Sequence, residues 1–421
     1  MYLKHLQFRN IRCFADTGVG FDRGQGDNRK WTVLLGENGT GKSTVLRAAA
    51  AVMAGSDAVV ELIRDPADWL RHGAGEGSIS AVLSTKRNET REISLSFRQG
   101  DTVSDFLRRA TDTLAPLEEA LKHTTRNYPV FGYGASRRLG TGRAFETSRA
   151  YSHPRARALA TLFDRHAQLN PLEQWAMRLD YTSEGTQTGL IKSVLDEFLG
   201  GDLSFAGIDK QAETLLFDTP DGRVALEDLS DGYQNVAAWV GDLLYQITDT
   251  FEDYQNPLHA RGLLLIDEVD LHLHPKWQRR LIDLLDRQLP NMQILATTHS
   301  VVTAQQAPEG ALHYAIRRDG AAPVIEAFTG DPGALLLNHL LVTEAFGHVS
   351  DESVDLERQK AEYRAAAQAQ GDGPQLESPT LSRIAERASS VPRDPAAAID
   401  LSPRQRELLQ SLRGTPGEGD E

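Results

Sequence analysis

Residues 36–44 read GENGTGKST, which has the G-x-x-x-x-G-K-[ST] form of a phosphate-binding loop. The apolar residues 31–35 before the loop predict a β-strand, and the Ala-rich residues 45–53 after it favour a helix. This order of strand, loop and helix is the context that the motif requires, so an ordinary glycine-rich turn is the weaker interpretation. The sequence therefore predicts a nucleoside triphosphate as a ligand.

In such a loop, consecutive backbone N–H groups converge on phosphate oxygens, and the glycines permit that geometry. Lys42 can bridge the β- and γ-phosphates and is a candidate catalytic residue, while Ser43 can offer its hydroxyl to Mg²⁺. ATP and Mg²⁺ are the expected ligands. The nucleotide-binding residues expected from the loop are Asn38, Gly39, Gly41, Lys42, Ser43 and Thr44.

A second motif ends in two carboxylates. Residues 262–267, GLLLID, are typical of a buried parallel strand and are followed by Glu268. Next to a magnesium nucleotide, Asp267 would hold the metal directly or through water, and Glu268 would orient and deprotonate the attacking water. A solvated strand end is the alternative, and the phosphate-binding loop upstream makes it the weaker one.

Residues 229–234, LSDGYQ, precede a long helical pattern and resemble the signature motif of ABC-type ATPases. In that family the motif contacts the γ-phosphate held by the opposite subunit. The resemblance assigns this contact to Ser230, Gly232 and Gln234, and a helix N-terminus does attract anions. A plain helix cap at Ser230 would give a similar pattern, so both interpretations stay open.

The remaining motifs follow in the order of that superfamily. Residues 269–275, VDLHLHP, resemble the D-loop region of RecF-like and OLD-like ATPases, and residues 294–300, ILATTHS, resemble a core strand that ends in the switch histidine. His299 would then sense the γ-phosphate, although an isolated histidine is more often buried or a cap. Residues 3–14, LKHLQFRNIRCF, resemble the start of SMC-like heads and place Arg12 near the nucleotide.

Composition indicates a soluble, cytoplasmic enzyme. The chain has 421 residues and a single cysteine, Cys13, so it offers no intrachain disulfide framework and no zinc cluster. No apolar run approaches the roughly 20 residues of a membrane helix. These features argue against an ABC transporter, and we expect no association with a membrane.

The net charge of −14 argues against uniform attraction to DNA, so a nucleic-acid contact would need a local basic patch. One arginine-rich stretch between residues 137 and 157 is a candidate for binding nucleic-acid phosphates, the nucleotide or an acidic partner. A solvated helical face is the alternative. The stretch contains Arg137, Arg138, Arg143, Arg149, Arg155 and Arg157.

About 180 residues separate the loop from the signature motif, which is more than a nucleotide site requires. Residues 78–84 and 92–97 alternate in polarity and predict an antiparallel hairpin. Patterns over 103–123 and 156–199 predict helices without sustained heptads, which excludes a long coiled-coil arm and indicates a compact helical lobe at about 101–200. Residues 1–350 form the expected head. The polar residues 351–421 form the expected tail, with helices at 354–369 and 402–412 and with disordered parts.

Several segments together resemble the bacterial AAA-type, ABC-like ATPases typified by PtuA of the Septu anti-phage system and present in some retron systems. The resemblance covers the chain up to about residue 353 and rests on the nucleotide motifs and on YPVFGYGASRRLG (128–140), LFDRHAQLNPLEQWAMRLDY (162–181) and LLVTEAFGHVSDES (340–353). It implies an α/β ABC-type P-loop NTPase head with a mixed core sheet, an antiparallel β subdomain and an inserted helical lobe. It also implies an ATPase that controls a separate HNH-type nuclease according to its nucleotide state.

The resemblance further implies a homodimer or a higher homo-oligomer. Each nucleotide would be capped by the signature motif of another copy. No segment after residue 300 offers the clustered acids of a nuclease domain, so any cutting would fall to a partner. The glutamine that usually links the metal to the lobe has no clear position in this sequence. A RecF- or SMC-like ATPase that acts directly on DNA is the alternative function, and a stand-alone binding module is a weaker third.

Overall fold

The computed structural model describes residues 2–22, 28–85, 89–123, 127–137, 151–182, 188–199, 203–251, 257–318 and 320–350, together with 354, 355, 357, 358 and 361. The chain divides into two compact units, Met1–Val349 and Ser350–Glu421. The helix predicted at 354–369 lies mostly outside the described residues, and the one predicted at 402–412 lies wholly outside them. The elements below belong to the first unit.

The core is a six-stranded mixed sheet in the order β13-β12-β3-β11-β10-β6, parallel except for β13. Every residue of β3, β6, β10 and β11 is buried, as expected for parallel strands covered on both faces. The strands are β3 (Trp31–Gly36), β6 (Val130–Tyr133), β10 (Gly262–Ile266), β11 (Met292–Thr297), β12 (Leu312–Ile316) and β13 (Val324–Ala327).

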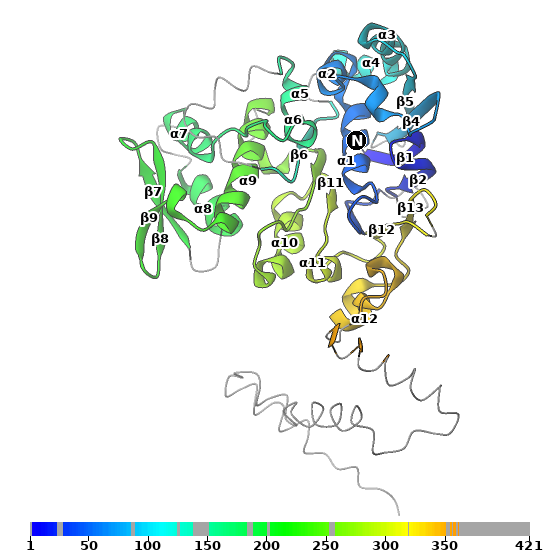
Figure 1. Ribbon diagram of the computed structural model, residues 1–421. Helices are drawn as coiled ribbons and strands as arrows, with labels where there is room; N and C mark the ends of the chain where they lie inside the picture. Colours follow the sequence, from blue (N-terminus) through cyan, green and yellow to red (C-terminus); the bar gives the residue numbers. More distant parts are fainter. Residues whose placement is uncertain are drawn as a thin grey trace, which may run out of the picture. The chain divides into compact units, whose positions relative to one another are not determined.

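Alternate residues of the core strands enter two different hydrophobic clusters. In β10, Leu263 and Leu265 pack with helix α1 (Lys42–Ala54), while Leu264 and Ile266 pack with helices α9 (Asp231–Thr250) and α10 (Pro275–Gln288). Figure 1 shows α1 on one side of these strands and α9 and α10 on the other. The sheet is therefore covered on both faces.

The antiparallel subdomain has the strand order β2-β1-β4-β5 and packs in the same cluster as α1. The predicted hairpin is confirmed as β4 paired with β5. The strands are β1 (Tyr2–Ile11), β2 (Phe14–Gly20), β4 (Glu76–Ser84) and β5 (Thr90–Arg98), and the nearby helices are α2 (Ser56–Leu62), α3 (Val103–Thr113) and α4 (Ala115–His123).

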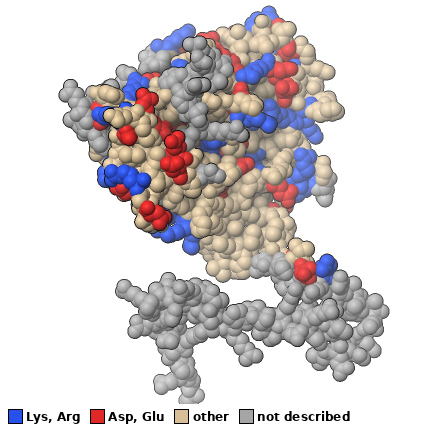
Figure 2. All heavy atoms as spheres, turned by 60° about the vertical axis from the view of Figure 1, so that its left-hand side comes forward, with Lys and Arg blue, Asp and Glu red and all other residues tan. Residues whose placement is uncertain are grey.

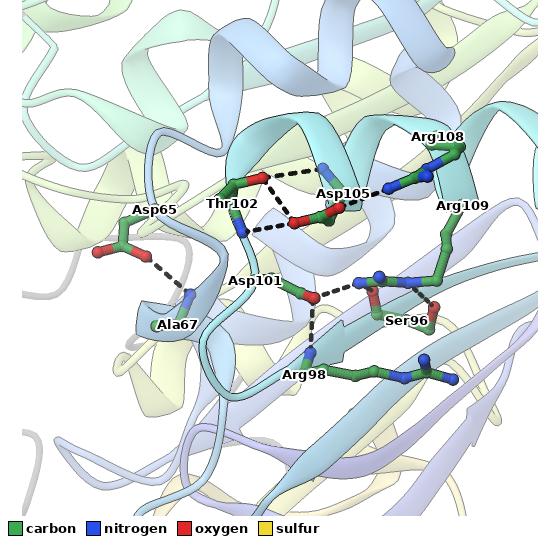
Figure 3. A network of polar contacts seen from close by, with 9 residues as sticks. All are labelled: Asp65, Ala67, Ser96, Arg98, Asp101, Thr102, Asp105, Arg108 and Arg109. Carbon is green, nitrogen blue, oxygen red and sulfur yellow. Dashed lines mark hydrogen bonds and ion pairs between the residues drawn. The ribbon is translucent and has the colours of Figure 1, made fainter.

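Helix α3 is fastened at its start and along its side (Figure 3). Thr102 and Asp105 form a reciprocal capping box, in which each side chain accepts a hydrogen bond from the backbone N–H of the other. Arg109 donates to Asp101 and to the hydroxyl of Ser96 on β5. These bonds hold α3 against the edge strand of the subdomain.

The helices between residues 101 and 200 do not form one lobe. Strand β6 lies within this range and joins the core sheet, because its four residues, VFGY, are all buried. Helices α3 and α4 pack on β5 before it, while α7 and α8 pack on α9 after it. The later group also includes a three-stranded sheet (Figure 1). The elements of this later group are α7 (Leu172–Thr182), α8 (Thr188–Leu199), β7 (Ser204–Asp209), β8 (Thr214–Thr219) and β9 (Gly222–Ala225). The short helices α5 (Pro154–Arg157) and α6 (Ala160–Phe163) pack instead on α2 and on β6, respectively.

Two short helices complete the unit, α11 (Val301–Gln305) and α12 (Leu337–Leu341). Among the residues that the structure describes, no helix combines the length and the apolar character that a bilayer crossing requires.

His313 on β12 makes stability depend on pH. It is 5% exposed, its Nδ1 lies 3.2 Å from the Ala311 carbonyl oxygen, and its Nε2 lies 3.3 Å from Nη1 of Arg29. Burial, with a smaller effect of Arg29, lowers the pKa of His313 from 6.5 to about 4. Because the folded state binds its proton less readily, stability is full above pH 6.5 and falls as the pH decreases toward 4.

We expect this loss to be on the order of 3 kcal/mol, and we expect His313→Leu to flatten the dependence. Urea unfolding at about pH 4.5 and about pH 7.5 measures it. The exposed His339 supplies the control, His339→Gln, which should leave the difference between the two pH values unchanged. An unchanged difference in His313→Leu would contradict the assignment.

Candidate nucleotide site

The carboxyl ends of four adjacent parallel strands meet at one edge of the core sheet. In register, Thr297 of β11 pairs with Leu34 of β3, and Ile266 of β10 pairs with both Ala296 of β11 and Tyr133 of β6. The segments that follow these strands therefore emerge side by side, and in open α/β sheets ligands bind at this edge. The phosphate-binding loop, the carboxylate pair, the switch histidine and the start of the arginine-rich stretch all follow from these strands.

The loop between β3 and α1 needs glycine at two positions. Gly41 caps α1 with a φ of 97°, and a Cβ there would lie 2.4 Å from the ring of Phe14 and 2.6 Å from the sulfur of Cys13. A Cβ at Gly36 would lie 2.5 Å from the carbonyl oxygen of Ala315. Asn38 and Gly39 are exposed at the tip, Ser43 is half-buried, and Thr44 is buried. The loop thus presents backbone and small polar groups, which fits a phosphate chain.

Lys42 folds back over its own loop. Its Nζ donates to the carbonyl oxygens of Gly36 and Glu37, at 2.8 Å each. Burial lowers the pKa of Lys42, and the carboxylates of Asp267, Glu268 and Glu37 oppose this shift. The cation is therefore already placed between the loop and the carboxylate pair.

Thr297 connects the two predicted carboxylate residues. Its hydroxyl donates to Oδ1 of Asp267 at 2.6 Å and accepts from the backbone N–H of Glu268 at 2.7 Å. Asp267 is 7% exposed, whereas Glu268 is half-buried and has a φ of 48°, in the left-handed region. The sequence reasoning missed Thr297, although two threonines directly before His299 were a visible signal.

Asp270 is a further buried carboxylate that the sequence reasoning did not select. It accepts hydrogen bonds from the hydroxyls of Thr298, at 2.7 Å, and Thr303, at 2.6 Å. It therefore holds the segment after Glu268 to the start of α11. His299 is exposed between them, and partial desolvation and the charge of Lys42 lower its pKa.

Arg12 lies in the turn between β1 and β2 with a φ of 48°. Its guanidinium stacks on Trp69, 4.9 Å from the ring centroid. Burial, followed by the charge of Arg47 on α1, lowers the pKa of Arg12. The next residue, Cys13, borders Gly41 of the loop, so the structure places this turn beside the phosphate-binding loop.

The signature motif starts α9. Ser230 occupies the cap position, but it is exposed and its side chain makes no capping hydrogen bond, so the plain-cap interpretation does not account for it. Gly232 faces the D-loop, and a Cβ there would lie 3.0 Å from the carbonyl oxygen of His272. Gln234 differs from the expectation, because its amide nitrogen donates to the carbonyls of Glu227 and Leu229 at 2.8 and 2.7 Å. It braces the motif from within its own chain.

The comparison with protein families decides the classification. The family model described as "AAA domain, putative AbiEii toxin, Type IV TA system" matches residues 31–304, from the first residue of β3 to α11. The chain belongs to this family. The match contains all the motifs of the AAA domain described above except the turn with Arg12.

Relatives of this AAA domain include the Septu protein PtuA of Bacillus mycoides (strain KBAB4), which is 25% identical over 348 residues. These residues cover 82% of this chain and 45% of that protein. The "Retron Vc95 probable ATPase" of Vibrio cholerae serotype O1 biovar El Tor is 21% identical over 381 residues, 72% of this chain and 73% of that protein. The resemblance to Septu and retron ATPases is thereby confirmed. The chain spans about half the length of the Septu relative.

Solved structures similar to this chain include SMC head domains. One, bound to the C-winged helix domain of ScpA, has a TM-score of 0.43 and 15% identity, covering 78% of this chain and 98% of that one. The SMC head domain from Thermotoga maritima has a TM-score of 0.40 and 18% identity, covering 78% and 100%. These scores are low, so the description of the fold rests on the strand order.

A buried network joins the signature helix of this AAA domain to the carboxylate strand. Tyr133 lies at the end of β6. Its backbone carbonyl accepts a hydrogen bond from the backbone N–H of Asp267 at 2.8 Å, and its hydroxyl donates a hydrogen bond to Asp242 of α9 at 2.9 Å. Asp242 also accepts two bonds from Asn170, and burial raises its pKa. A displacement of α9 would therefore act on the backbone next to Asp267.

In the part of the arginine-rich stretch that the structure describes, two of the three arginines do not belong to a surface patch. Arg137 is 6% exposed, and Arg155 donates to the carbonyl oxygens of Met53, Ala54 and Tyr128, so both side chains serve the interior. Arg157 is exposed, while Arg138, Arg143 and Arg149 lie outside the described residues. On the face shown in Figure 2, basic and acidic side chains are interspersed. Arg155 can serve the interior in this way because the five donors of arginine satisfy several carbonyl groups at once.

Proposed function

We propose that this protein binds and hydrolyses ATP, and that its nucleotide state governs the association of two or more copies. The observation that carries the proposal is the convergence of Lys42, Ser43, Asp267, Glu268 and His299 at one edge of the core sheet. The match to an AAA family and the ATPase named among the relatives support the same activity.

In the proposed reaction the loop amides and Lys42 hold the phosphates, and Lys42 offsets charge on the γ-phosphate. Ser43 and Asp267 are the residues that would hold Mg²⁺, which supplies charge neutralisation at the β- and γ-phosphates. Glu268 accepts the proton of the attacking water as that water attacks the γ-phosphorus atom, and ADP leaves with its β-phosphate oxygen. His299 then contacts the γ-phosphate from the next strand.

Ser230 and Gly232 would complete the site of another copy. They lie at the N-terminus of a 20-residue helix, and the Ser230 hydroxyl is exposed and unused by the helix. A symmetric dimer would then contain two composite sites, each with the loop of one copy and the signature motif of the other. Binding of ATP would join the copies, and hydrolysis would release them.

The relatives support a place in anti-phage defence, because they are named after Septu and retron systems. We infer that the chain is the ATPase subunit of such a system and that it controls a separate, HNH-type nuclease. A RecF- or SMC-like enzyme acting directly on DNA has less support, because Arg137 is buried and Arg155 donates to carbonyls inside the protein.

A mixing experiment tests the composite site. Lys42→Met should weaken nucleotide binding and remove the charge that offsets the γ-phosphate, and Ser230→Arg should block capping, so each variant alone should be nearly inactive. In an equimolar mixture, half of the dimers are mixed and contain one intact site, so about a quarter of the wild-type rate should return. Phosphate release measured at equal total protein gives the result.

The control mixes one of the single variants with a variant that carries both substitutions. No dimer in that mixture contains an intact site. Recovery in that control, or no recovery in the first mixture, would contradict capping by a second copy. Thermal unfolding of Ser230→Arg should match wild type, because the side chain is exposed.

A further inference from the structure

Arg137 lies just beyond the end of β6 and is 6% exposed. One of its terminal nitrogens donates to the backbone carbonyl of Glu268. Its Nε and its other terminal nitrogen, Nη1, are buried without a hydrogen-bond partner. Buried donors are almost always paired in folded proteins, so two unpaired donors on one cation call for an explanation.

The carbonyl that Arg137 binds belongs to a strained turn. Glu268 has a φ of 48°, which a residue with a side chain rarely adopts. The same carbonyl also accepts the backbone N–H of Leu271 at 3.0 Å. Arg137 therefore fastens the carbonyl side of this turn, as Thr297 fastens its N–H side, and the turn sets the direction of the Glu268 carboxylate.

The charges around Arg137 are negative. Asp267, Glu268 and Asp270 act on its guanidinium and oppose the effect of burial, which lowers its pKa to about 10. The protein thus keeps a cation buried behind the carboxylate pair, with spare donors. Arg155 is the contrasting case, since its half-buried side chain donates to four backbone carbonyls, two at the end of α1 and two in the segment before β6.

We propose that Arg137 is a positioning residue for Glu268 and that phosphate oxygens of bound ATP supply the partners of its two unpaired nitrogens. This inference rests on the proposed function. It makes the geometry of Glu268 depend on the presence of the γ-phosphate, so the base is fully fixed only when there is a phosphate to hydrolyse. Arginine suits this role because its donors form a planar fork, which lysine lacks.

The test compares Arg137→Lys with Arg155→Lys, in which the same change is made at a half-buried, fully hydrogen-bonded arginine away from the site. Arg137→Lys should lower kcat by about 10-fold or more while the KM for ATP changes less than about 3-fold. Without nucleotide, it should also accelerate hydrogen exchange at the amides of Val269 and Leu271. Arg155→Lys should change neither the kinetic constants nor the hydrogen exchange at these amides, even if it lowers thermal stability as much as Arg137→Lys does. Equal effects of the two substitutions, or a kcat within about twofold of wild type, would overturn the inference.

If Arg137→Lys does not fold, hydrogen exchange of the wild-type protein tests the inference instead. A non-hydrolysable ATP analogue should slow exchange at Val269 and Leu271 more than ADP does, and equal protection would overturn the inference. Glu268→Gln separates this inference from the proposed function. If wild type hydrolyses ATP, Glu268→Gln does not and Arg137→Lys does, only the role of Arg137 is refuted. If wild type does not hydrolyse ATP, the proposed function fails, and the exchange measured without nucleotide still tests the hold on Glu268.

Discussion

Replacing Glu268 with glutamine is expected to lower kcat for ATP hydrolysis by about 10²- to 10⁴-fold. The substitution keeps the size and the hydrogen-bonding capacity of the side chain but removes the group that accepts a proton. The left-handed turn at Glu268 is held by backbone contacts, to Thr297 and to Arg137, so it should persist. Affinity for ATP should therefore stay within about threefold of wild type.

Phosphate release and calorimetric titration with ATP measure the two quantities separately. Glu309→Gln, at an exposed turn, is the matched control and should leave both unchanged. A variant that still turns over ATP at the wild-type rate would show that another group activates the water.

The same variant should hold the protein in its ATP-bound state. Purified from its host with ATP, Glu268→Gln should therefore retain copies of itself and the proposed nuclease in stoichiometric amounts. Recovery of DNA or of repair proteins alone would favour direct action on DNA instead.

Replacing Lys42 with methionine is expected to weaken ATP binding by about 10- to 100-fold, because it removes charge-assisted hydrogen bonds to the phosphates. Without ATP, the substitution removes a buried cation but leaves the carbonyls of Gly36 and Glu37 without their donor. These effects oppose each other, so thermal stability without nucleotide should change little.

The measurement is the rise in Tm caused by ATP at about ten times the wild-type Kd, which reports affinity through linkage. The rise should fall to less than about a third of the wild-type value in Lys42→Met. It should be unchanged in Lys276→Met, whose side chain is exposed on α10. An ATP-induced rise of normal size in Lys42→Met would argue that the nucleotide binds elsewhere.

The core of the fold was predictable because its strands are short apolar runs attached to motifs of fixed spacing. GLLLI before Asp267 and WTVLL before Gly36 can bury both faces only as inner parallel strands, and the structure has them there. The hairpin of β4 and β5 followed from alternating polarity. The prediction of a single helical lobe was wrong, because strand β6 interrupts that region. A strand of four residues is too short for a periodic pattern to place it in the core sheet.

The candidate site was predictable where the chemistry of the ligand requires one residue type, as the phosphates require Lys42 and the metal requires Asp267. It was not predictable where side chains serve other protein groups. Thr297 acts through Asp267 and Glu268, and Gln234 turned back to its own loop. Arg137 and Arg155 appeared to belong to one surface patch because sequence proximity does not reveal the direction of a side chain.

The order of strands in the core sheet has a consequence for synthesis of the chain. Strand β3 is synthesised early, but its neighbours in the sheet are β11 and β12. Leu34 therefore cannot pair until Thr297 has been synthesised, and Leu35 cannot pair until Tyr314 has been synthesised. Until then, an apolar strand that will be wholly buried has no partner on either side, and such exposed edges promote aggregation. Fragments that end before β11 should therefore be insoluble, because the antiparallel subdomain and α1 cover only the face of β3 that carries Leu34, while Trp31, Val33 and Leu35 face the other cluster.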